Sequence, residues 1–500
     1  MTSSTFIWLI IIPIFASPVV YLLGRLGVQQ KILQQRTQIV RWTAFGALLT
    51  TVIPLVLAIR DYFHHELGVL KIESLSLQAD GLSLLVAVVS LALALLVVLF
   101  SGPYMANEIG EEKYYAMLLA MTGLIIGLSC ASDLFNLWVW FEAMAVSSYL
   151  LVAFYRRQPA ALEAGIKYLV QSATGSVFVL FGIALVLGET ATLNLENLRT
   201  YSQPSTVLVA AGALFIIGFG VKAALVPLHT WLPDAHSQAP SGISAMLSGV
   251  VIEMGLIALL RVLTALAAEN HVWGSALMVF GAVNMLLGNM LALRQVQVKR
   301  LLAYSSLSQM GYMLLGLGIA YRSGEVLGTQ GALFHLVNHG FMKGLAFLAV
   351  GALLYALSIS LGNHTPLLVD DLSGASKRYP ITSLCLSIAL LGLAGLPPLA
   401  GFMSKWQIFL AGFESGDSLI AGLVVFAALN SVLSLGYYAP LVNRLYRKTP
   451  SPTVLAGSSL PAVMVTPLVV LGLVVIVLGL DPGLMTWLTE AAASALMKGF

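Results

Sequence analysis

Residues 218–236, GFGVKAALVPLHTWLPDAH, decide the fold because they place one lysine inside an apolar run. The run begins near Val207 and is almost wholly apolar apart from Lys222, and Pro227 and Pro233 follow it. A charge at the centre of a bilayer costs a few kcal/mol, so an intramembrane lysine is by default a functional residue. The prolines predict an interrupted helix whose freed backbone groups face protein or water.

The whole chain has the composition of a polytopic, all-α membrane protein. Of its 500 residues, 59% are hydrophobic and 9% are charged, which lies far outside the range of soluble domains. The first apolar stretch lacks a basic segment before it, so we expect a retained helix rather than a cleaved signal. Cys130 and Cys385 are the two cysteines, and their wide separation gives neither a disulfide framework nor an iron–sulfur spacing.

About 20 apolar residues cross the hydrocarbon core as a helix, and on this measure the sequence predicts fourteen spans. They are residues 5–24, 42–59, 81–101, 114–131, 134–155, 163–188, 207–229, 241–266, 272–293, 301–321, 329–357, 380–411, 418–442 and 460–480. Spans eleven and twelve are too long for one simple helix. The twelfth contains GLPPLAG, so we expect it to break at Pro397 and Pro398.

Basic residues in short loops predict the orientation of the chain. With the N-terminus outside, the inside loops hold 15 of the 25 basic residues. These are Arg25, Lys31, Arg36, Arg41, Lys113, Arg156, Arg157, Arg294, Lys299, Arg300, Lys377, Arg378, Arg444, Arg447 and Lys448. We therefore expect both termini on the outside, the face opposite the cytoplasm or its equivalent.

Three matched segments indicate an internal repeat of five helices. The pairs are 141–155 with 304–318, 168–176 with 335–343, and 224–231 with 395–402, at offsets of 163, 167 and 171. A nearly constant offset favours duplication, although shared bilayer composition can produce one such match. The predicted parts are residues 1–110 (three helices), 111–268 and 269–445 (the two repeats, spans four to eight and nine to thirteen), and 446–500 (a helix and tail).

Ionisable side chains inside these spans are the candidate functional groups, since each is costly to place there. They are Glu142, Lys222, Glu253, His335, His339, Lys343 and Lys405, with Lys167, His229 and Asp234 as secondary candidates.

Glu142 and Lys222 belong to one predicted repeat and are candidates to meet across its interior. A pair about 4 Å apart interacts by about 4 kcal/mol at an effective dielectric near 20. Separating the pair lowers the proton affinity of the lysine, so a pair whose separation can change is a proton switch. The alternative is a static ion pair that fixes two helices.

His335, His339 and Lys343 follow one another at intervals of four residues and therefore share one helix face. Imidazole accepts and donates protons near neutral pH, so this face is a candidate relay. Hydrogen bonds between helices are the alternative role for the two histidines. A zinc site is disfavoured because no nearby acid supplies a third ligand.

The remaining charges have two interpretations each. Lys405 follows the predicted break, where it either lies in a water-filled cavity or extends to the interface, and Lys167 has the same ambiguity. Arg261 is expected to anchor its helix or to pair with an acid. Asp234 and His236 are expected in a loop, where they cap span eight.

Four segments carry a resemblance to a known family: FGVKAALVPLHTWLPDAHSQAPSGISAMLSG, VKRLLAYSSLSQMGYMLLG, GALFHLVNHGFMKGLAFLAVGAL and GLAGLPPLAGFMSKWQIF. Over roughly residues 80–445 the chain resembles the antiporter-like subunits of respiratory complex I, of Mrp-type cation/proton antiporters and of membrane-bound hydrogenases. The resemblance implies fourteen helices, two inverted five-helix repeats that each contain a broken helix, and a midplane line of charges. It assigns this line to Glu142, Lys222, His335, His339, Lys343 and Lys405.

One position departs from the family. Most members carry a lysine in the eighth helix, where this chain has Glu253 in SGVVIEMGLIALLR. Either the carboxylate of Glu253 carries the proton between Lys222 and the histidines, or the altered charge order serves another ion. The chain also ends soon after span fourteen, without the long lateral helix of one complex I subunit.

No nucleophile–base motif, P-loop or dinucleotide fingerprint occurs, so we expect no active site and no cofactor in this chain. The resemblance implies a proton-translocating subunit in an energy-transducing membrane, partnered by antiporter-like paralogues, small membrane subunits and a redox arm, with no nucleic acid. A subunit of an Mrp-type Na⁺/H⁺ antiporter is the alternative within the same class. From other classes, a quinone-binding oxidoreductase and an assembly scaffold stay open.

Overall fold

A computed structural model of the chain describes residues 5–26, 33–64, 69–72, 75–106, 108–201, 205–266, 270–361 and 365–497. The predicted inside residue Lys31 lies outside these ranges. Apart from one short hairpin, every regular element in them is a helix. Ten of the described helices are long and apolar enough to cross a membrane, and two more are shorter apolar helices. The chain is therefore an all-α polytopic membrane protein, while the count of fourteen crossings stays a prediction.

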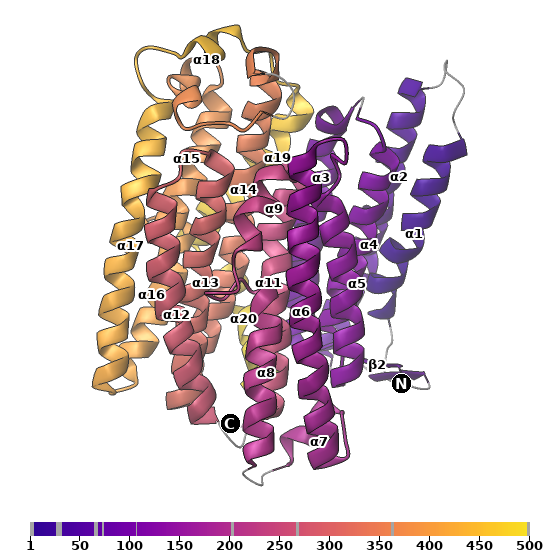
Figure 1. The fold of residues 1–500 in the computed structure, drawn as a ribbon, viewed down its shortest axis with the longest axis vertical. Coiled ribbons are helices and arrows are strands. Elements are labelled where there is room, and N and C mark those ends of the chain that lie inside the picture. Colours follow the sequence, from indigo (N-terminus) through magenta and orange to yellow (C-terminus); the bar gives the residue numbers. More distant parts are fainter. Residues whose placement is uncertain are drawn as a thin grey trace.

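The long helices stand side by side and roughly parallel to one long axis (Figure 1). The N-terminal part contains α1 (Ile7–Leu26), α2 (Leu33–Phe63), β1 (Val69–Ile72), β2 (Leu75–Gln78) and α3 (Gly81–Met105). The first predicted repeat contains α4 (Glu111–Ser129), α5 (Leu134–Val152), α6 (Pro159–Thr190), α7 (Leu195–Arg199), α8 (Thr206–Lys222), α9 (Trp231–Gln238), α10 (Ser241–Met246), the π-helix η2 (Leu247–Val251) and α11 (Ile252–Ala265).

The second predicted repeat contains α12 (Asn270–Leu293), α13 (Val298–Ser323), α14 (Val326–Leu361), the 3-10 turns η4 (Asp370–Leu372) and η5 (Ala375–Lys377), α15 (Pro380–Ala394), α16 (Ala400–Glu414) and α17 (Ser418–Leu445). The chain then forms α18 (Pro452–Ala456), α19 (Ala462–Leu480) and α20 (Gly483–Met497). Both chain ends lie at the edge of the bundle that carries α7 and β2, opposite α18 (Figure 1).

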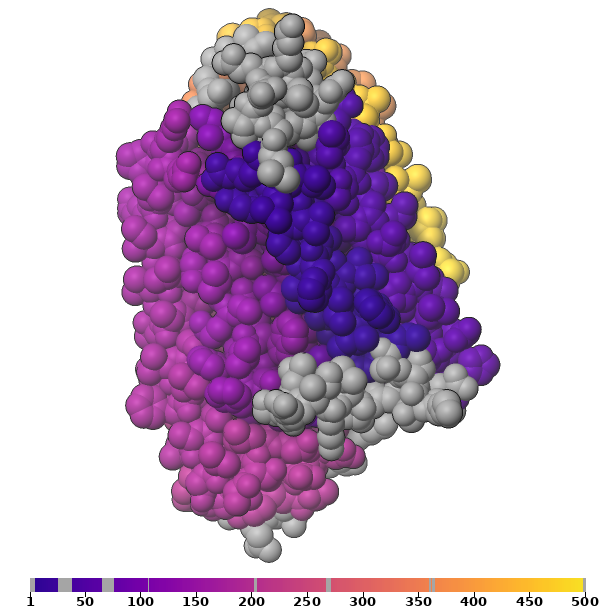
Figure 2. All heavy atoms as spheres, turned by 90° about the vertical axis from the view of Figure 1, so that its right-hand side faces the viewer, coloured from indigo at the N-terminus to yellow at the C-terminus, as the bar shows by residue number. Residues whose placement is uncertain are grey.

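The N-terminal helices form one flank of the bundle. Figure 2 shows the indigo helices α1 and α2 crossing this face between the magenta helices of the first predicted repeat and the yellow C-terminal part. Many of their apolar side chains are exposed, such as Phe15 at 69% and Ile53 at 63%. Exposed apolar side chains are stable in lipid or against another membrane subunit.

Both predicted helix breaks are present. The helix α8 ends at Lys222, and a non-helical segment that contains Pro227 leads to α9. The helix α15 ends at Ala394, and a segment that contains Pro397 and Pro398 leads to α16. The Val226–Pro227 and Pro397–Pro398 peptide bonds are cis. Each break leaves main-chain carbonyl groups of the preceding turn without helical partners.

The expectation for span eleven was wrong, because α14 is one continuous helix of 36 residues. At 1.5 Å per residue it is about 54 Å long, well beyond the bilayer core. It contains no proline, and 89% of its most apolar window is buried inside the protein. A helix surrounded by protein does not need to match the thickness of lipid, so its length requires no break.

Three further features were not predicted. The π-helix η2 interrupts span eight, and α20 follows span fourteen and packs against α3 and α14. The strands β1 and β2 form an antiparallel hairpin. The loop expected for Asp234 and His236 is wrong, because both residues lie in α9. The inverted repeat and the four-part division stay predictions.

Candidate functional site

Six of the predicted ionisable residues are buried in the protein interior. Their exposed fractions are 0–2%, and they come from α8, α11, α14 and α16. We call this set the charge row; it consists of Lys222, Glu253, His339, His335, Lys343 and Lys405. None of these side chains faces lipid, so each must be satisfied by protein groups or by water.

Lys222 is the last residue of α8, beside the break. Its Nζ lies 3.4 Å from Ser148 Oγ and 4.4 Å from the ring centre of Tyr168. The Tyr168 ring stacks on Trp231 of α9 at 3.9 Å. A cation over an aromatic face is stabilised by about 0.5–2 kcal/mol. The amine is therefore held by a hydroxyl and an aromatic stack.

The direct Glu142–Lys222 ion pair does not form. No ion pair of 4.0 Å or less joins them in the described part of the chain, and the buried Glu142 Oε1 has no hydrogen-bond partner there. Lys222 instead approaches Ser148, six residues further along α5, which is about 9 Å along the helix axis. The carboxylate still acts electrostatically on the amine. The direct contact expected between the two side chains is therefore not made, and the proton switch stays a prediction.

Lys222 also lies against α11, the helix that carries Glu253. A Cβ added to Gly255 would lie 2.9 Å from the Lys222 Cβ, so only glycine permits this contact. Glu253 is two residues before Gly255 and two residues after the end of η2. The first two members of the charge row thus lie on helices in direct contact.

Glu253 and His339 form the central pair of the row. His339 Nδ1 and Glu253 Oε1 are 2.8 Å apart, and both side chains are fully buried. The other atoms of the pair, Glu253 Oε2 and His339 Nε2, are buried without a hydrogen-bond partner in the described structure. Such atoms are rare in folded proteins and usually mark bound water or a functional site. Glu253 is therefore hydrogen-bonded directly to the histidine face of α14.

His335 continues the row toward the second break. Its ring centre is 6.5 Å from that of His339. Its Nδ1 is 2.9 Å from Ser404 Oγ and its Nε2 is 3.0 Å from Gln309 Oε1. His335 therefore makes the helix-to-helix hydrogen bonds of the alternative interpretation. One of them joins α14 to α13 and the other joins α14 to α16.

Lys405 and Lys343 are held by neutral groups. Lys405 Nζ donates to Leu393 O and to Ser431 Oγ, each at 3.0 Å, and lies 4.4 Å from the ring centre of Tyr312. With 2% exposure, Lys405 does not extend to the interface. Lys343 Nζ donates to Leu302 O at 2.7 Å and also to the Ser305 hydroxyl.

The secondary residues lie nearer the surface. Asp234 does not cap span eight; its carboxylate accepts from Lys167 at 3.0 Å and from Arg300 at 2.5 Å, which ties α9 to α6 and α13. Lys167 also pairs with Glu163 and is 46% exposed. The Nδ1 of His229, in the first break, is buried without a partner in the described structure.

Arg261 pairs with an acid, as one interpretation required. Two of its nitrogens donate to the carboxylate of Asp80, each at 2.9 Å, and Asp80 caps α3. This pair joins α11 to the start of α3, so it has a structural role outside the charge row.

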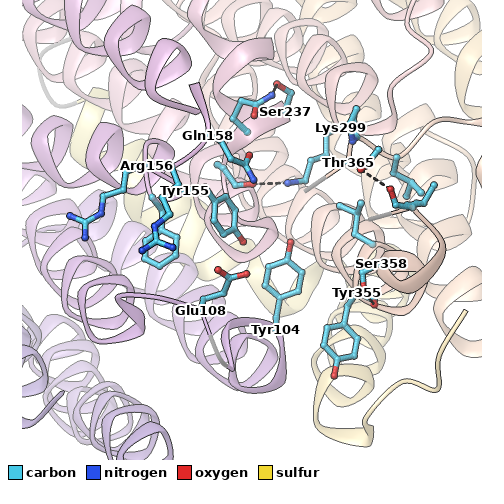
Figure 3. Close-up of a pocket in the computed structure, with 18 of the residues that line it drawn as sticks. Tyr104, Glu108, Tyr155, Arg156, Gln158, Ser237, Lys299, Tyr355, Ser358 and Thr365 are labelled. Carbon is cyan, nitrogen blue, oxygen red and sulfur yellow. Dashed lines mark hydrogen bonds between the residues drawn. The ribbon is translucent and has the colours of Figure 1, made fainter. Parts of the chain in front are cut away.

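The sequence analysis treated His236 only as a cap in a loop and Lys299 only as a basic residue of an inside loop, and it did not predict the cavity beside the end of α9. The cavity is about 520 Å³ and lies between the end of α3, the α5–α6 loop, the end of α9 and the start of α13. Figure 3 shows Tyr104, Glu108 and Tyr155 on one side and Lys299 on the other. Only Lys299 carried a sequence signal, as a basic residue of an inside loop. Among the described residues, no group of three His, Cys, Asp or Glu side chains is placed to hold a metal ion.

Comparisons with known proteins identify the family of the chain. Residues 131–431 match the family described as NADH:quinone oxidoreductase/Mrp antiporter, and residues 68–115 match the N-terminal segment of complex I chain 5. F(420)H(2) dehydrogenase subunit N of Methanosarcina mazei is 34% identical over 419 residues, which are 81% of this chain and 83% of that protein. NADH-quinone oxidoreductase subunit N of Desulforudis audaxviator is 32% identical and covers 80% of each chain.

A solved structure shares the whole fold. In the membrane-bound sulfane sulfur reductase, an archaeal respiratory membrane complex, one chain superposes with a TM-score of 0.86 and 29% identity. The match covers 99% of this chain and 98% of that one. The chain therefore belongs to the family of antiporter-like membrane subunits shared by complex I and the Mrp antiporters.

Proposed function

We propose that this chain is a proton-translocating subunit of a redox-driven membrane complex. The observation that supports this most strongly is the buried Glu253–His339 pair inside the charge row. A carboxylate and an imidazole in hydrogen-bond contact exchange a proton with little movement. The relatives at 34% and 32% identity are named as subunits of a F(420)H(2) dehydrogenase and a NADH-quinone oxidoreductase, which favours electron transfer as the energy source.

The proposed route follows the contacts of the row. A proton enters near Lys222, and the charge of Glu142 alters the proton affinity of the Lys222 amine. It passes through Glu253 and His339, with Lys343 one helical turn away. It then passes His335, whose Nδ1 hydrogen bond to Ser404 leads to the neighbouring residue Lys405, where we place release.

We also propose that both termini face outside, in the plasma membrane of a bacterium or archaeon or in a thylakoid. Both chain ends lie at one edge of the bundle (Figure 1), which supports a common side. The cavity is lined by Arg156, Arg157 and Lys299. All three are among the basic residues of the loops predicted to face inside, which supports the proposed side.

Purification with partners and a lysine variant test the proposal. An affinity tag on this chain should recover redox subunits with flavin or iron–sulfur absorbance. In inside-out vesicles supplied with NADH or F(420)H(2), Lys222→Ala should abolish acidification, while Lys448→Ala, which changes an exposed lysine, should not. Undiminished acidification with Lys222→Ala would refute the route. Recovery of antiporter subunits alone, with no redox partner, would assign the chain to a Na⁺/H⁺ antiporter instead.

A further inference from the structure

His236 is a buried histidine that no hydrogen bond explains. Its exposed fraction is 0%, and neither Nδ1 nor Nε2 has a hydrogen-bond partner in the described structure. Leaving one buried polar group unsatisfied costs about 1–3 kcal/mol. An imidazole with both nitrogens unsatisfied therefore indicates either bound water or a functional role.

The position of His236 links the cavity to the charge row. The three residues that follow it, Ser237, Gln238 and Ala239, line the cavity. Its ring packs against Phe347 of α14, the helix that carries His339 and Lys343. His236 thus joins the cavity-lining end of α9 to the helix that carries the histidines of the row.

Polar groups mark the path between them. The hydroxyl of Tyr104, in the cavity wall, lies 3.2 Å from Ser241 Oγ at the start of α10. On the same helix, Ser244 Oγ donates to the main-chain oxygen of His236 at 3.2 Å. Lys299 Nζ donates to Ala239 O at 2.6 Å, which fixes the amine beside the end of α9. Hydroxyl groups of this kind can also bind water molecules beside the end of α9.

The ring of His236 is held without its nitrogens being used. It stacks on Phe347 of α14, with ring centres 4.7 Å apart and planes 13° from parallel. Stacking covers a face of the ring, and the two nitrogens on its edge are buried without a hydrogen-bond partner in the described structure. The charged or titratable groups that interact electrostatically with His236 are Lys343, Lys299 and His339.

We propose that His236 is the entry relay that carries protons from the cavity to the Glu253–His339 pair. The inference rests on the proposed function and specifies its uptake step: a proton taken up near Lys222 reaches the Glu253–His339 pair through His236. The charge of Lys222, on the helix that contacts α11, sets whether the pair accepts that proton. One ring nitrogen forms an N–H bond with a proton of cavity water, and hydroxide or a deprotonated buffer is left behind. The N–H bond on the other nitrogen then breaks, and its proton passes to Glu253 Oε2 or His339 Nε2, the unpartnered atoms of the pair. The imidazole returns to its neutral form with its tautomer exchanged, and a rotation of the ring or proton exchange with water restores the starting tautomer before the next proton enters.

The test replaces the histidine in the assembled complex. His236→Gln keeps a polar side chain that does not titrate, so steady acidification in inside-out vesicles should fall at least about tenfold. His271→Gln changes an exposed histidine at the start of α12 and should leave acidification unchanged. Complex content is matched by immunoblot. Acidification by His236→Gln within twofold of wild type would overturn the proposal.

A second measurement does not depend on the folding of that variant. In Ser237→Cys the new thiol should react, after assembly, with a membrane-impermeant maleimide from the inside only, and labelling should block acidification. Full acidification by the labelled complex would overturn the proposal. The native Cys130 and Cys385 are buried, so background labelling should be low. Failure of the proposed function is separate, since it would appear as absent acidification in the unlabelled wild-type complex.

Discussion

Replacing Glu253 by glutamine tests whether the central pair carries protons or only joins two helices. Glu253→Gln has nearly the same volume, and its amide can still meet His339 Nδ1, which now lies 2.8 Å from a carboxylate oxygen. The expected change in stability is the difference between a charge-assisted and a neutral hydrogen bond, about 1 kcal/mol. We therefore expect the complex to assemble.

Proton transport should respond very differently from stability. The amide does not bind a proton at working pH, so the step from Glu253 to His339 loses its carrier. Removing a positioned acid or base typically costs about 100-fold or more in rate. The initial rate of acidification in inside-out vesicles, normalised to assembled complex, measures this loss. Glu414→Gln, an exposed glutamate at the end of α16, is the matched control.

A third variant separates structure from transport. Glu253→Ala removes the partner of a fully buried imidazole and leaves a cavity, so it should destabilise the complex by about 3–5 kcal/mol if the pair is ionised. With a neutral pair the loss should be nearer about 1–3 kcal/mol. If Glu253→Gln assembles and acidifies vesicles at the wild-type rate, Glu253 is structural and the proposed route is refuted.

Two further predictions concern the fold around the row. Burial raises the pKa of Asp80, but the charge and hydrogen bonds of Arg261 outweigh burial and hold that pKa below its ordinary value. Asp80→Asn should therefore lower the thermal stability of the purified complex by about 3 kcal/mol near neutral pH. The wild-type complex should lose the same contribution as pH falls below about 4, where Asp80 becomes protonated. A Cβ at Gly401 would clash with a main-chain oxygen of α15, whereas a Cβ at Gly422 would meet nothing within 4 Å. Gly401→Ala should therefore reduce the amount of assembled complex on immunoblots, and Gly422→Ala should not.

The helices and their breaks follow from local properties that a sequence displays. Pro397 and Pro398 cannot continue a helix, and the observed break surrounds them. The first break begins at Lys222, five residues before Pro227, because a proline disrupts the turn that precedes it. Apolar length predicts membrane helices, but it failed for α14, which is surrounded by protein rather than lipid.

The contacts of the site depended on packing that no single segment encodes. Spacing placed His335 and His339 on one face, which is a local property. That Glu253 meets His339, 86 positions away, depends on how α11 and α14 pack. The expected contact of Glu142 with Lys222 is absent for the same reason. The Lys222 amine instead lies beside Ser148, which is on α5 like Glu142. His236 was expected in a loop, but it lies in α9, where Pro233 is tolerated because it stands in the first turn of the helix.

The environment of the lysines explains why a carboxylate at position 253 matters. Lys405 and Lys343 donate to main-chain carbonyl oxygens and hydroxyls, and Lys222 approaches a hydroxyl and an aromatic face. Such dipoles hold an ammonium group without fixing it as a carboxylate contact would. Two unit charges about 10 Å apart interact by about 1.7 kcal/mol at an effective dielectric of 20, which is about a 17-fold change in proton affinity. In the proposed route, a change of charge at Glu253 would therefore alter the proton affinity of any lysine within that distance, and so couple uptake to release.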